Sequence, residues 1–248
     1  MSSKHYHEQL LHTDNYIIPY LESVLKVNLA TISIMEVGCA EGGTIRKLSD
    51  YGARVQGIEL EPARVELALD INPDLNIEIG DITDKHIFKN IGETFDLIII
   101  RDVIEHILDK QTAFGNLARL LKTGGTLYIT FPPLYSPFAG HQQHAKSLIA
   151  KGPYIYLLPL VIFRWLCKSL GESDYFIQQV LSNYHNGLSI NSFIKMYNNH
   201  GFINKETKYF LMRPIFKTRF GLNIVEIPNI PGIRGIIALG CESILVKG

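Results

Sequence analysis

The sequence predicts an α/β fold with a doubly wound, mostly parallel sheet. From about residue 32 to residue 131, short β-rich runs alternate with amphipathic stretches of helical length, as in successive strand–helix–strand units. The run FDLIII (95–100) is apolar almost throughout, as expected for a central strand covered by helices on both faces. No Pro/Gly/Ser-rich linker divides the 248 residues, so we expect one domain over 1–248.

The spacing of apolar residues places the elements in chain order. Apolar positions at helical spacing between 8 and 26 predict an opening helix that packs onto the sheet. A helix over 110–122 has one apolar face and ends at a Gly-Gly pair. The other predicted elements are strands at 32–37, 53–59, 76–79, 95–100, 126–131, 203–212 and 236–246, and helices at 41–51, 62–71 and 189–200.

The alternation breaks after the fifth predicted strand. Residues 132–188 contain many aromatic residues, His and Pro, and no clear strand. Regular spacing returns only with the predicted helix at 189–200. We therefore expect 132–188 to be an insertion that forms a helical lid.

Composition argues against a nucleic-acid partner, because Lys plus Arg and Asp plus Glu number 24 each and no basic stripe stands out. Cys39, Cys167 and Cys241 lack the spacing of a metal site or a disulfide framework, which favours a reducing compartment. The start MSSKHYHEQL is too polar for a signal peptide. The longest apolar run, 154–163, contains Pro159 and is too short to cross a bilayer. We expect a soluble, cytoplasmic protein.

A turn of small residues follows the first predicted strand. The strand carries an acid, Glu36, near its end, and Gly38, Ala40 and Gly42 follow at alternate positions. Small residues at such a turn allow the backbone to approach a ligand closely. Taken alone, the turn is equally typical of an ordinary strand–helix loop.

Polar residues at the ends of three further predicted strands point to a nucleoside-type ligand. Glu59 ends the second strand, where a carboxylate can accept hydrogen bonds from both hydroxyls of a ribose. Asp81 follows the third strand, where an acid can accept a hydrogen bond from an adenine amino group, and Arg101 follows the fourth. Because the carboxyl ends of parallel strands face one crevice, we expect these groups to share a site.

Five consecutive motifs resemble those of class I S-adenosylmethionine-dependent methyltransferases: EVGCAEG, GIEL, GDI, FDLIIIRDVIEHI and LLKTGGTLYITFP. The resemblance covers roughly residues 16–132 together with the closing helix and strands. It implies a Rossmann-like sheet of seven strands with the last antiparallel, S-adenosylmethionine as the cofactor and S-adenosylhomocysteine as the product. The cofactor-binding residues that it implies are Glu36, Gly38, Cys39, Ala40, Gly42, Glu59, Leu60, Asp81, Ile82 and Arg101.

Two details qualify this resemblance. The family usually has a glycine at the position of Ala40, and alanine is small enough that we expect binding to survive. Dinucleotide oxidoreductases share the small-residue turn and the ribose acid, but Glu41 at the helix start would repel a diphosphate. We therefore do not expect a nicotinamide cofactor.

The first candidate for chemistry is the segment DVIEH. On one helical turn, Asp102, Glu105 and His106 would share a face. His106 could then act near the cofactor or the acceptor, or the three side chains could hold a metal ion. A similar acid-x-x-Glu-His group binds a metal in ubiquinone-pathway O-methyltransferases and small-RNA methyltransferases. The Glu-His pair also occurs in this superfamily without a metal, so metal dependence stays open.

The second candidate is the start of the insertion, which leaves the carboxyl end of the fifth predicted strand and must pass close to the transferable methyl group. We favour His141 over His144 as a base because His141 is closer to the strand. Side chains there that could grip a polyol are Tyr135, Ser136, His141, Gln142, Gln143 and His144.

The stretch 151–171 is apolar and aromatic, with Lys151, Arg164 and Lys168 nearby. This composition favours a lid over the acceptor, and an interfacial helix that touches a membrane or a lipid-linked substrate is the alternative. The insertion also resembles, more weakly, bacterial methyltransferases associated with surface-polysaccharide synthesis.

The sequence as a whole predicts an O-methyltransferase for a sugar or glycan hydroxyl, with His106 or His141 assisting proton removal. Methylation of a nitrogen, a carbon or a phenolic oxygen of another small molecule stays open. So does a non-catalytic subunit that only binds the cofactor.

Overall fold

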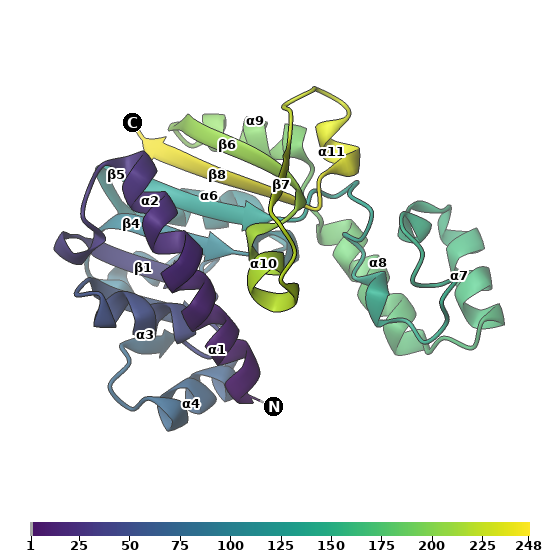
Figure 1. The fold of residues 1–248 in the computed structure, drawn as a ribbon, viewed down its shortest axis with the longest axis horizontal. Helices are drawn as coiled ribbons and strands as arrows, with labels where there is room; N and C mark the ends of the chain where they lie inside the picture. The colour runs from purple at the N-terminus through teal and green to yellow at the C-terminus, as the bar shows by residue number, and fades with distance from the viewer. Residues whose placement is uncertain (1) are drawn as a thin grey trace.

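A computed structural model describes residues 2–248, with side chains from residue 4 onward. Its core is one sheet in the order β3-β2-β1-β4-β5-β8-β6-β7 (Figure 1). The strands are β1 (Ser33–Val37), β2 (Arg54–Glu59), β3 (Ile77–Ile79), β4 (Phe95–Arg101), β5 (Leu121–Phe131), β6 (Phe202–Met212), β7 (Val225–Ile227) and β8 (Gly240–Lys247). The five strands from β1 to β5 are mutually parallel, and β8 runs antiparallel to both β5 and β6. The predicted doubly wound, mostly parallel sheet is confirmed.

The prediction of seven strands was wrong by one. The additional strand is β7, three residues that pair antiparallel with the outer edge of β6. So short a segment carries no periodic pattern in the sequence, and its pairing depends on β6 lying beside it.

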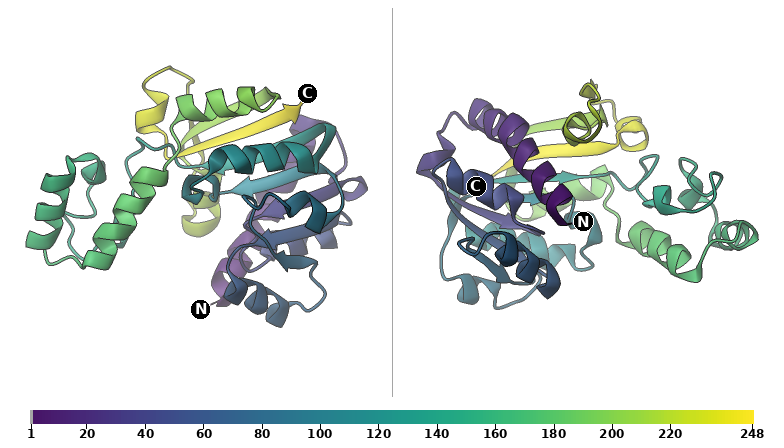
Figure 2. Two further views of the ribbon diagram at one scale, coloured as in Figure 1. Left: turned by 180° about the vertical axis from the view of Figure 1, so that it is seen from behind. Right: turned by 60° about the horizontal axis from the view of Figure 1, so that its bottom comes forward.

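Helices cover both faces of the sheet (Figures 1 and 2). They are α1 (Ser2–His12), α2 (Ile18–Leu25), α3 (Gly43–Asp50), α4 (Pro62–Ile71), α5 (Ile87–Ile91), α6 (Lys110–Leu120), α7 (Leu160–Ser169), α8 (Asp174–Asn186), α9 (Ile190–Asn199), α10 (Pro214–Phe220) and α11 (Arg234–Ile237). Alternate residues of β4 explain the two layers, because Ile98 and Ile100 pack with α6 and α9 while Leu97 and Ile99 pack with α2, α3 and α4. The predicted burial of this strand on both faces is confirmed.

The opening helix departs from regular geometry at its centre. The helix predicted over 8–26 consists of α1, a π-helical turn (Thr13–Ile17) and α2. Pro19 has no N–H and its ring would clash with the carbonyl of Asn15 in a regular α-helix. A wider turn before Pro19 accommodates the ring.

The boundary between α6 and β5 was also predicted too late in the chain. We expected a helix to residue 122 and a strand from 126, whereas α6 ends at Leu120 and β5 begins at Leu121. Leu121 is buried and pairs with Phe95 of β4, and Gly124 lies in the left-handed region at φ 73°. The glycine pair therefore forms an irregularity within the strand and does not precede it.

The insertion after β5 forms a lobe that projects away from the sheet. Figure 2 shows α7 and α8 beside the body of the molecule, joined to it through the segment that leaves β5. We call residues 145–186 the projecting lobe. It has its own small core, in which Phe163 and Cys167 of α7 meet Ile177 and Val180 of α8. No helix among residues 2–248 is long and apolar enough to span a membrane.

Candidate functional site

A cavity of about 890 Å³ opens at the carboxyl ends of the parallel strands. It lies where the strand order changes direction between β1 and β4, which is the place where open α/β sheets bind their ligands. The ends of β1, β2, β4 and β5 form its floor, and α1, α10 and the start of the insertion form its walls. Residues at the ends of all four strands from β1 to β4 line this cavity, namely Gly38, Glu59, Asp81 and Arg101, so the predicted meeting of these four strand ends is confirmed.

The glycine-rich loop (residues 38–43) turns sharply between β1 and α3. Gly38 has φ 71°, and a Cβ there would lie 2.3 Å from Cγ2 of Val103. Ala40 also adopts a left-handed conformation, at φ 51°, which costs an alanine about 1 kcal/mol. The backbone of this loop thus keeps the conformation that a glycine would adopt at residue 40.

Glu59 links this loop to the end of β2. One of its carboxylate oxygens accepts a hydrogen bond from the N–H of Ala40 at 2.9 Å, and the other accepts from the N–H of Glu61 at 3.1 Å. These two bonds hold the carboxylate in place on the cavity wall. A carboxylate has further lone pairs, so Glu59 can still accept hydrogen bonds from ligand hydroxyls.

Glu36 and Arg101 form an ion pair beneath the loop, with Nη2 of Arg101 at 2.9 Å from Oε1 of Glu36. Arg101 also donates to the hydroxyl of Thr44. Burial raises the pKa of Glu36, and the neighbouring guanidinium opposes that rise. Oε2 of Glu36 and Nε of Arg101 are buried and have no hydrogen-bond partner in the described part of the chain, which leaves polar capacity next to the cavity.

The ten residues predicted to bind the cofactor divide into two groups. Three do not line the cavity: Glu36 lies beneath Arg101, the buried Cys39 faces β2, and Gly42 is the N-cap residue of α3. The other seven lie on the wall, namely Gly38, Ala40, Glu59, Leu60, Asp81, Ile82 and Arg101.

One face of α1 also lines the cavity, which the sequence did not lead us to expect. His5, Glu8, Gln9 and His12 recur at helical spacing on that face. Gln9 donates to the carbonyl of Cys39 at 3.3 Å and accepts from the N–H of Gly43 at 2.9 Å. The polar stripe was visible in the sequence, but nothing in the sequence indicated that the stripe would face a site.

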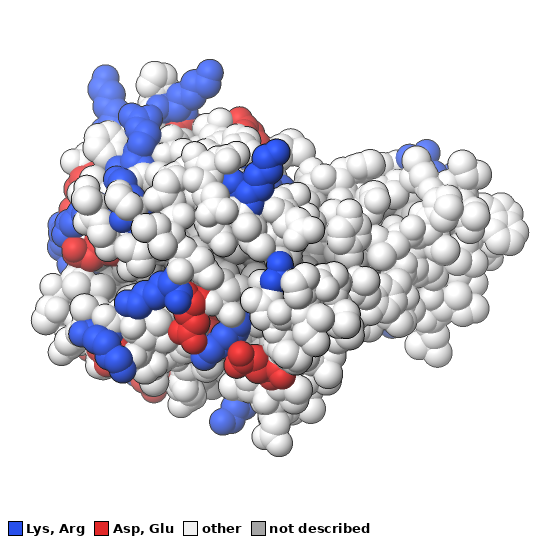
Figure 3. Space-filling view, turned by 90° about the horizontal axis from the view of Figure 1, so that it is seen from above, with Lys and Arg blue, Asp and Glu red and all other residues white. Residues whose placement is uncertain are grey.

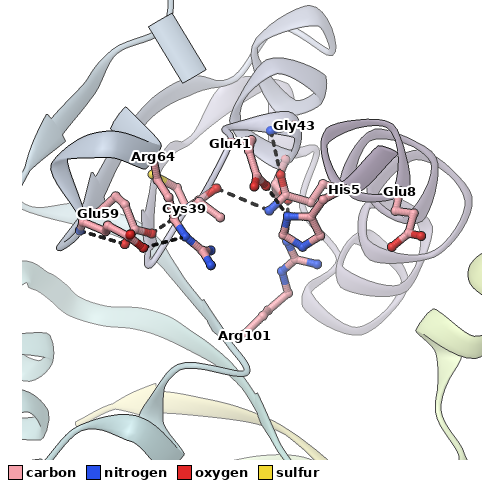
Figure 4. A network of polar contacts seen from close by, with 12 residues as sticks. His5, Glu8, Cys39, Glu41, Gly43, Glu59, Arg64 and Arg101 are labelled. Atoms are coloured by element: carbon pink, nitrogen blue, oxygen red, sulfur yellow. Dashed lines mark hydrogen bonds and ion pairs between the residues drawn. The ribbon is translucent and has the colours of Figure 1, made fainter. Parts of the chain in front are cut away.

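Figure 4 shows this contact from close by, with His5 pointing toward Glu41 and Arg101 reaching up from the sheet. His5 and Glu41 are within ion-pair distance. Two residues of α1, His5 and Gln9, therefore contact the glycine-rich loop along its length. Any ligand held by that loop would lie against α1.

Three further side chains of the cavity lining lie close together. One ligand atom from each of Glu105, His106 and His141 lies within 4.8 Å of the others. The rings of His106 and His141 meet edge to face, with centroids 5.2 Å apart. Glu105 is buried, and its Oε2 has no hydrogen-bond partner among residues 2–248.

The pKa values of this cluster all shift toward the neutral forms. Burial, together with the charge of Asp102, raises the pKa of Glu105 well above its usual value. Burial lowers the pKa of His106, and burial with the neighbouring His106 lowers that of His141 to about 4. Both imidazoles are therefore uncharged near neutral pH and can accept a proton.

Asp102 lies apart from this cluster, so the predicted grouping of Asp102, Glu105 and His106 was wrong for its first member. The chain turns at Asp102, which has φ 54°, and only Ile104–His106 form a helical turn. The carboxylate of Asp102 pairs with Arg213. Although burial alone would raise it, the charge of Arg213 holds the pKa of Asp102 below its usual value.

The start of the insertion contributes part of the predicted polyol-binding set. Ser136, His141, Gln143 and His144 line the cavity, whereas Tyr135 and Gln142 do not. Gln142 is fully buried and donates to the carbonyls of Pro137 and Gly152, so it stabilises the segment. Within the described insertion, residues from 145 onward do not reach the cavity, and their role as a lid stays a prediction.

The rest of the cavity lining was not predicted from the sequence. Arg213 and Arg219 reach the cavity from the segment RPIFKTRF, which follows β6 and forms α10. Glu242 of β8 is buried there and accepts hydrogen bonds from the hydroxyls of Tyr16 and Tyr128. Burial raises the pKa of Glu242 to about 7. The basic, aromatic composition of 213–220 was a visible signal, but only the end of β6 brings it to the site.

Comparison with known families agrees with this geometry. Residues 35–129 match the family described as "Methyltransferase domain". Solved structures share the fold over nearly the whole chain. The plantazolicin methyltransferase BamL, solved with a triazolic desmethylPZN analogue and SAH, has a TM-score of 0.61 at 11% identity and covers 99% of this chain and 89% of that one. An S-adenosylmethionine-dependent methyltransferase from Mesorhizobium loti has a TM-score of 0.58 at 18% identity, and the match covers 92% of this chain and 96% of that one.

Curated relatives match a smaller part. The ubiquinone biosynthesis O-methyltransferase of Pseudomonas fluorescens (strain Pf0-1) is 25% identical over 60% of this chain and 59% of its own length. The mitochondrial ubiquinone biosynthesis O-methyltransferase of Homo sapiens is 32% identical over 41% of this chain and 29% of its own length. The chain thus spans about three fifths of the first relative and less of the second. The predicted resemblance to class I S-adenosylmethionine-dependent methyltransferases is confirmed.

Proposed function

We propose that this chain, whose residues 35–129 match the methyltransferase-domain family, transfers the methyl group of S-adenosylmethionine to a hydroxyl of a sugar or glycan. The observation that carries the proposal is the pairing of two imidazoles, His106 and His141, on the same cavity as Gly38 and Glu59. One half of the cavity supplies groups that suit a nucleoside, and the other half supplies groups that suit proton removal.

The cofactor half is suited to an adenosyl group with an amino-acid tail. The carboxylate of Glu59, which lines the cavity, would accept hydrogen bonds from ribose hydroxyls, and Asp81 lines the same cavity. The unpartnered atoms of Glu36 and Arg101 lie next to the loop, where the charged amino and carboxylate groups of the tail would sit. When bound, the cofactor supplies a methyl group on a positively charged sulfur.

The acceptor half carries the groups that activate a hydroxyl. A neutral alcohol is a poor nucleophile, so removal of its proton as the new C–O bond forms lowers the barrier. Burial and the neighbouring His106 lower the pKa of His141 to about 4, which makes His141 a weak base. We assign proton acceptance to His106 and the orientation of His106 and the acceptor to His141.

The polarity of the cavity supports a polyhydroxylated acceptor. Five of the chain's nine histidines line it, together with Ser136 and Gln143. The lining also includes both acids and arginines, so a neutral molecule with many hydroxyls can find hydrogen-bond donors and acceptors there.

The test is transfer of a labelled methyl group to a panel of sugars, oligosaccharides, catechols and amines. We expect a sugar or oligosaccharide to be methylated on oxygen, and His106→Ala with His141→Ala to abolish that turnover. The matched control is His185→Ala, because His185 is exposed on α8 and does not line the cavity. Tight cofactor binding without turnover on any acceptor would identify a non-catalytic subunit instead.

A phenolic acceptor is the nearest alternative, because the two O-methyltransferase relatives above are named for ubiquinone biosynthesis. A phenol ionises near pH 10, far below an alcohol, and so depends less on a base. With a catechol acceptor, loss of both histidines would therefore reduce turnover only slightly, and the remaining rate would rise with pH.

A second candidate for the cluster is a divalent cation held by Glu105, His106 and His141. The residues fit such an ion, since two imidazoles and a carboxylate converge and one oxygen of Glu105 is buried without a partner in the described chain. A bound ion would polarise the acceptor hydroxyl, and His106 could not then act as a base.

Chelation separates the two arrangements. If a cation is required, turnover falls after chelation and returns with added Mg²⁺ or Zn²⁺, and elemental analysis finds the metal in wild type but not in Glu105→Gln. If His106 is the base, turnover is indifferent to the chelator.

A further inference from the structure

Helix α7 of the projecting lobe exposes large apolar side chains to solvent, unlike an ordinary surface helix. Its buried side consists of Phe163 and Cys167, which pack into the core of the lobe. On the opposite side of the helix lie Val161 and Trp165, with exposed fractions of 79% and 67%. Apolar side chains therefore lie on the solvent-exposed face of α7 as well as on its buried face.

Further apolar side chains are exposed on α7 and in the loop before it. Ile162 of α7 is 48% exposed, and in the loop before the helix Leu148 is 83% exposed. The carboxylate of Glu172, just after α7, accepts hydrogen bonds from the backbone N–H groups of Lys146 and Ser147. This loop therefore lies at the carboxyl-terminal end of α7. We call Leu148, Ile149, Val161, Ile162 and Trp165 the apolar crest.

The charges around the crest are almost all positive. Lys146, Arg164 and Lys168 are exposed, and Lys151 is half-buried. Of the two acids in the lobe, Glu172 is buried against backbone N–H groups, and Asp174 pairs with Lys168 at 3.4 Å. In Figure 3 the lobe that projects to the right is mostly white, and blue is the only charge colour visible on it.

We propose that the apolar crest of the lobe binds the surface of a membrane that contains anionic lipids. An aromatic and aliphatic crest with a flank of Arg and Lys suits the boundary between headgroups and acyl chains, where apolar side chains enter and cations meet lipid phosphates. A protein partner with an acidic rim or a second copy of this chain is a competing occupant. The excess of cations favours the lipid surface over a second copy, because two copies would bring like charges together.

The lobe is connected to the cavity. Tyr156 of the lobe donates to the carbonyls of Leu134 and Ser136, and Gln142 donates to the carbonyl of Gly152. These bonds hold the segment that carries His141. A membrane-bound lobe would therefore keep the acceptor side of the cavity close to the lipid surface.

Trp165 makes the proposal directly measurable, because it is the only tryptophan in the chain. The experiment adds vesicles of phosphatidylcholine alone, or of an equal mixture of phosphatidylcholine and phosphatidylglycerol, to the wild-type protein at low salt and records its emission. We expect a shift to shorter wavelength with the mixed vesicles, no shift with phosphatidylcholine alone, and reversal by added salt.

Variants separate the two contributions and keep Trp165 as the reporter. Val161→Ser with Ile162→Ser should weaken vesicle binding on the order of tenfold or more. Arg164→Gln with Lys168→Gln should weaken it about thirtyfold, which is the effect of removing two surface cations. Ile203→Ser, on an exposed position of β6, is the control and should bind as wild type does.

Two results would overturn the proposal. One is an emission that does not change with mixed vesicles at low salt. The other is a shift to shorter wavelength that grows with protein concentration in the absence of lipid, which would show that another copy of the chain covers the crest. All of these variants alter exposed side chains, and their thermal unfolding serves to verify that they fold.

Discussion

The imidazole rings of His106 and His141 meet edge to face, with centroids 5.2 Å apart, although one follows β4 and the other lies in the insertion after β5. β4 and β5 are adjacent and parallel, so their carboxyl ends deliver both side chains to the same wall. Burial keeps both rings uncharged near neutral pH. The pair can therefore accept a proton without first losing one.

The first prediction concerns this pair. His106→Ala should lower kcat about 10²- to 10⁴-fold, the usual contribution of a general base, and His141→Ala should lower it less. Binding of S-adenosylhomocysteine, measured by calorimetry, should stay within a few-fold of wild type for both. Equal turnover of wild type and the double variant at saturating acceptor would rule out this role, and His185→Ala controls for the loss of a histidine.

The second prediction concerns the cofactor half. Glu59→Gln keeps an oxygen that can accept from the N–H of Ala40 but removes the charge that would face the ribose. Loss of a charged hydrogen-bond acceptor costs about 1.5–3 kcal/mol, so affinity for S-adenosylhomocysteine should fall roughly ten- to hundredfold. Glu66→Gln, at an exposed position of α4, should bind as wild type does. Unchanged affinity in Glu59→Gln would remove Glu59 from the site.

The third prediction concerns the close approach of Gly38 and Val103. Gly38→Ala adds a Cβ that would lie 2.3 Å from Cγ2 of Val103, at a φ of 71°. Steric overlap and the left-handed conformation together should lower the free energy of unfolding by about 2–4 kcal/mol. In the Val103→Ala background the steric overlap is relieved, so Gly38→Ala should lower the free energy of unfolding by only about 1 kcal/mol. This remainder is the cost of the left-handed conformation.

A double-mutant cycle with chemical denaturation measures this coupling. The cost of Gly38→Ala should be smaller in the Val103→Ala background than in wild type. Equal costs in both backgrounds would mean that the two residues are not in steric contact.

The fourth prediction concerns Glu242. Its pKa is raised to about 7 in the folded protein from the 4.5 of an unperturbed carboxyl, because it is buried. The folded state then holds this proton more tightly than the unfolded state, so stability falls as the pH rises from about 4.5 to about 7 and levels off above that range. The loss reaches up to about 3 kcal/mol.

Glu242→Gln removes this titration and keeps partners for the hydroxyls of Tyr16 and Tyr128. Relative to wild type, the variant should gain stability steadily between pH 5 and about pH 7. Thermal unfolding of both proteins across this range provides the measurement. A difference in stability that does not change with pH would show that Glu242 does not titrate there.

Much of the fold could be predicted because local sequence determines it. Apolar runs of strand length placed β1 to β6 and β8 within a few residues, apart from the start of β5. The positions of Gly38, Glu59 and Asp81 relative to strand ends were enough to predict that these residues line one cavity, since parallel strands end at one edge. Two predictions were wrong. The eighth strand, β7, depends on pairing with β6, and Pro19 interrupts the regular geometry of the opening helix.

The acceptor half depended on contacts that sequence spacing does not encode. Asp102 was expected beside Glu105 and His106, but the chain turns there and Arg213 of a distant segment pairs with it. His141 joins the cluster because β5 runs beside β4.

The sequence by itself therefore determined β1 to β6, β8 and the main helices between them, together with the residues at the ends of β1 to β4, because hydrophobic period and turn chemistry are local properties. Only the tertiary structure decided which side chains share the cavity with them. The face of α1, the arginines of α10 and the buried Glu242 reach it through packing between segments far apart in the chain, and such packing leaves no periodic signal.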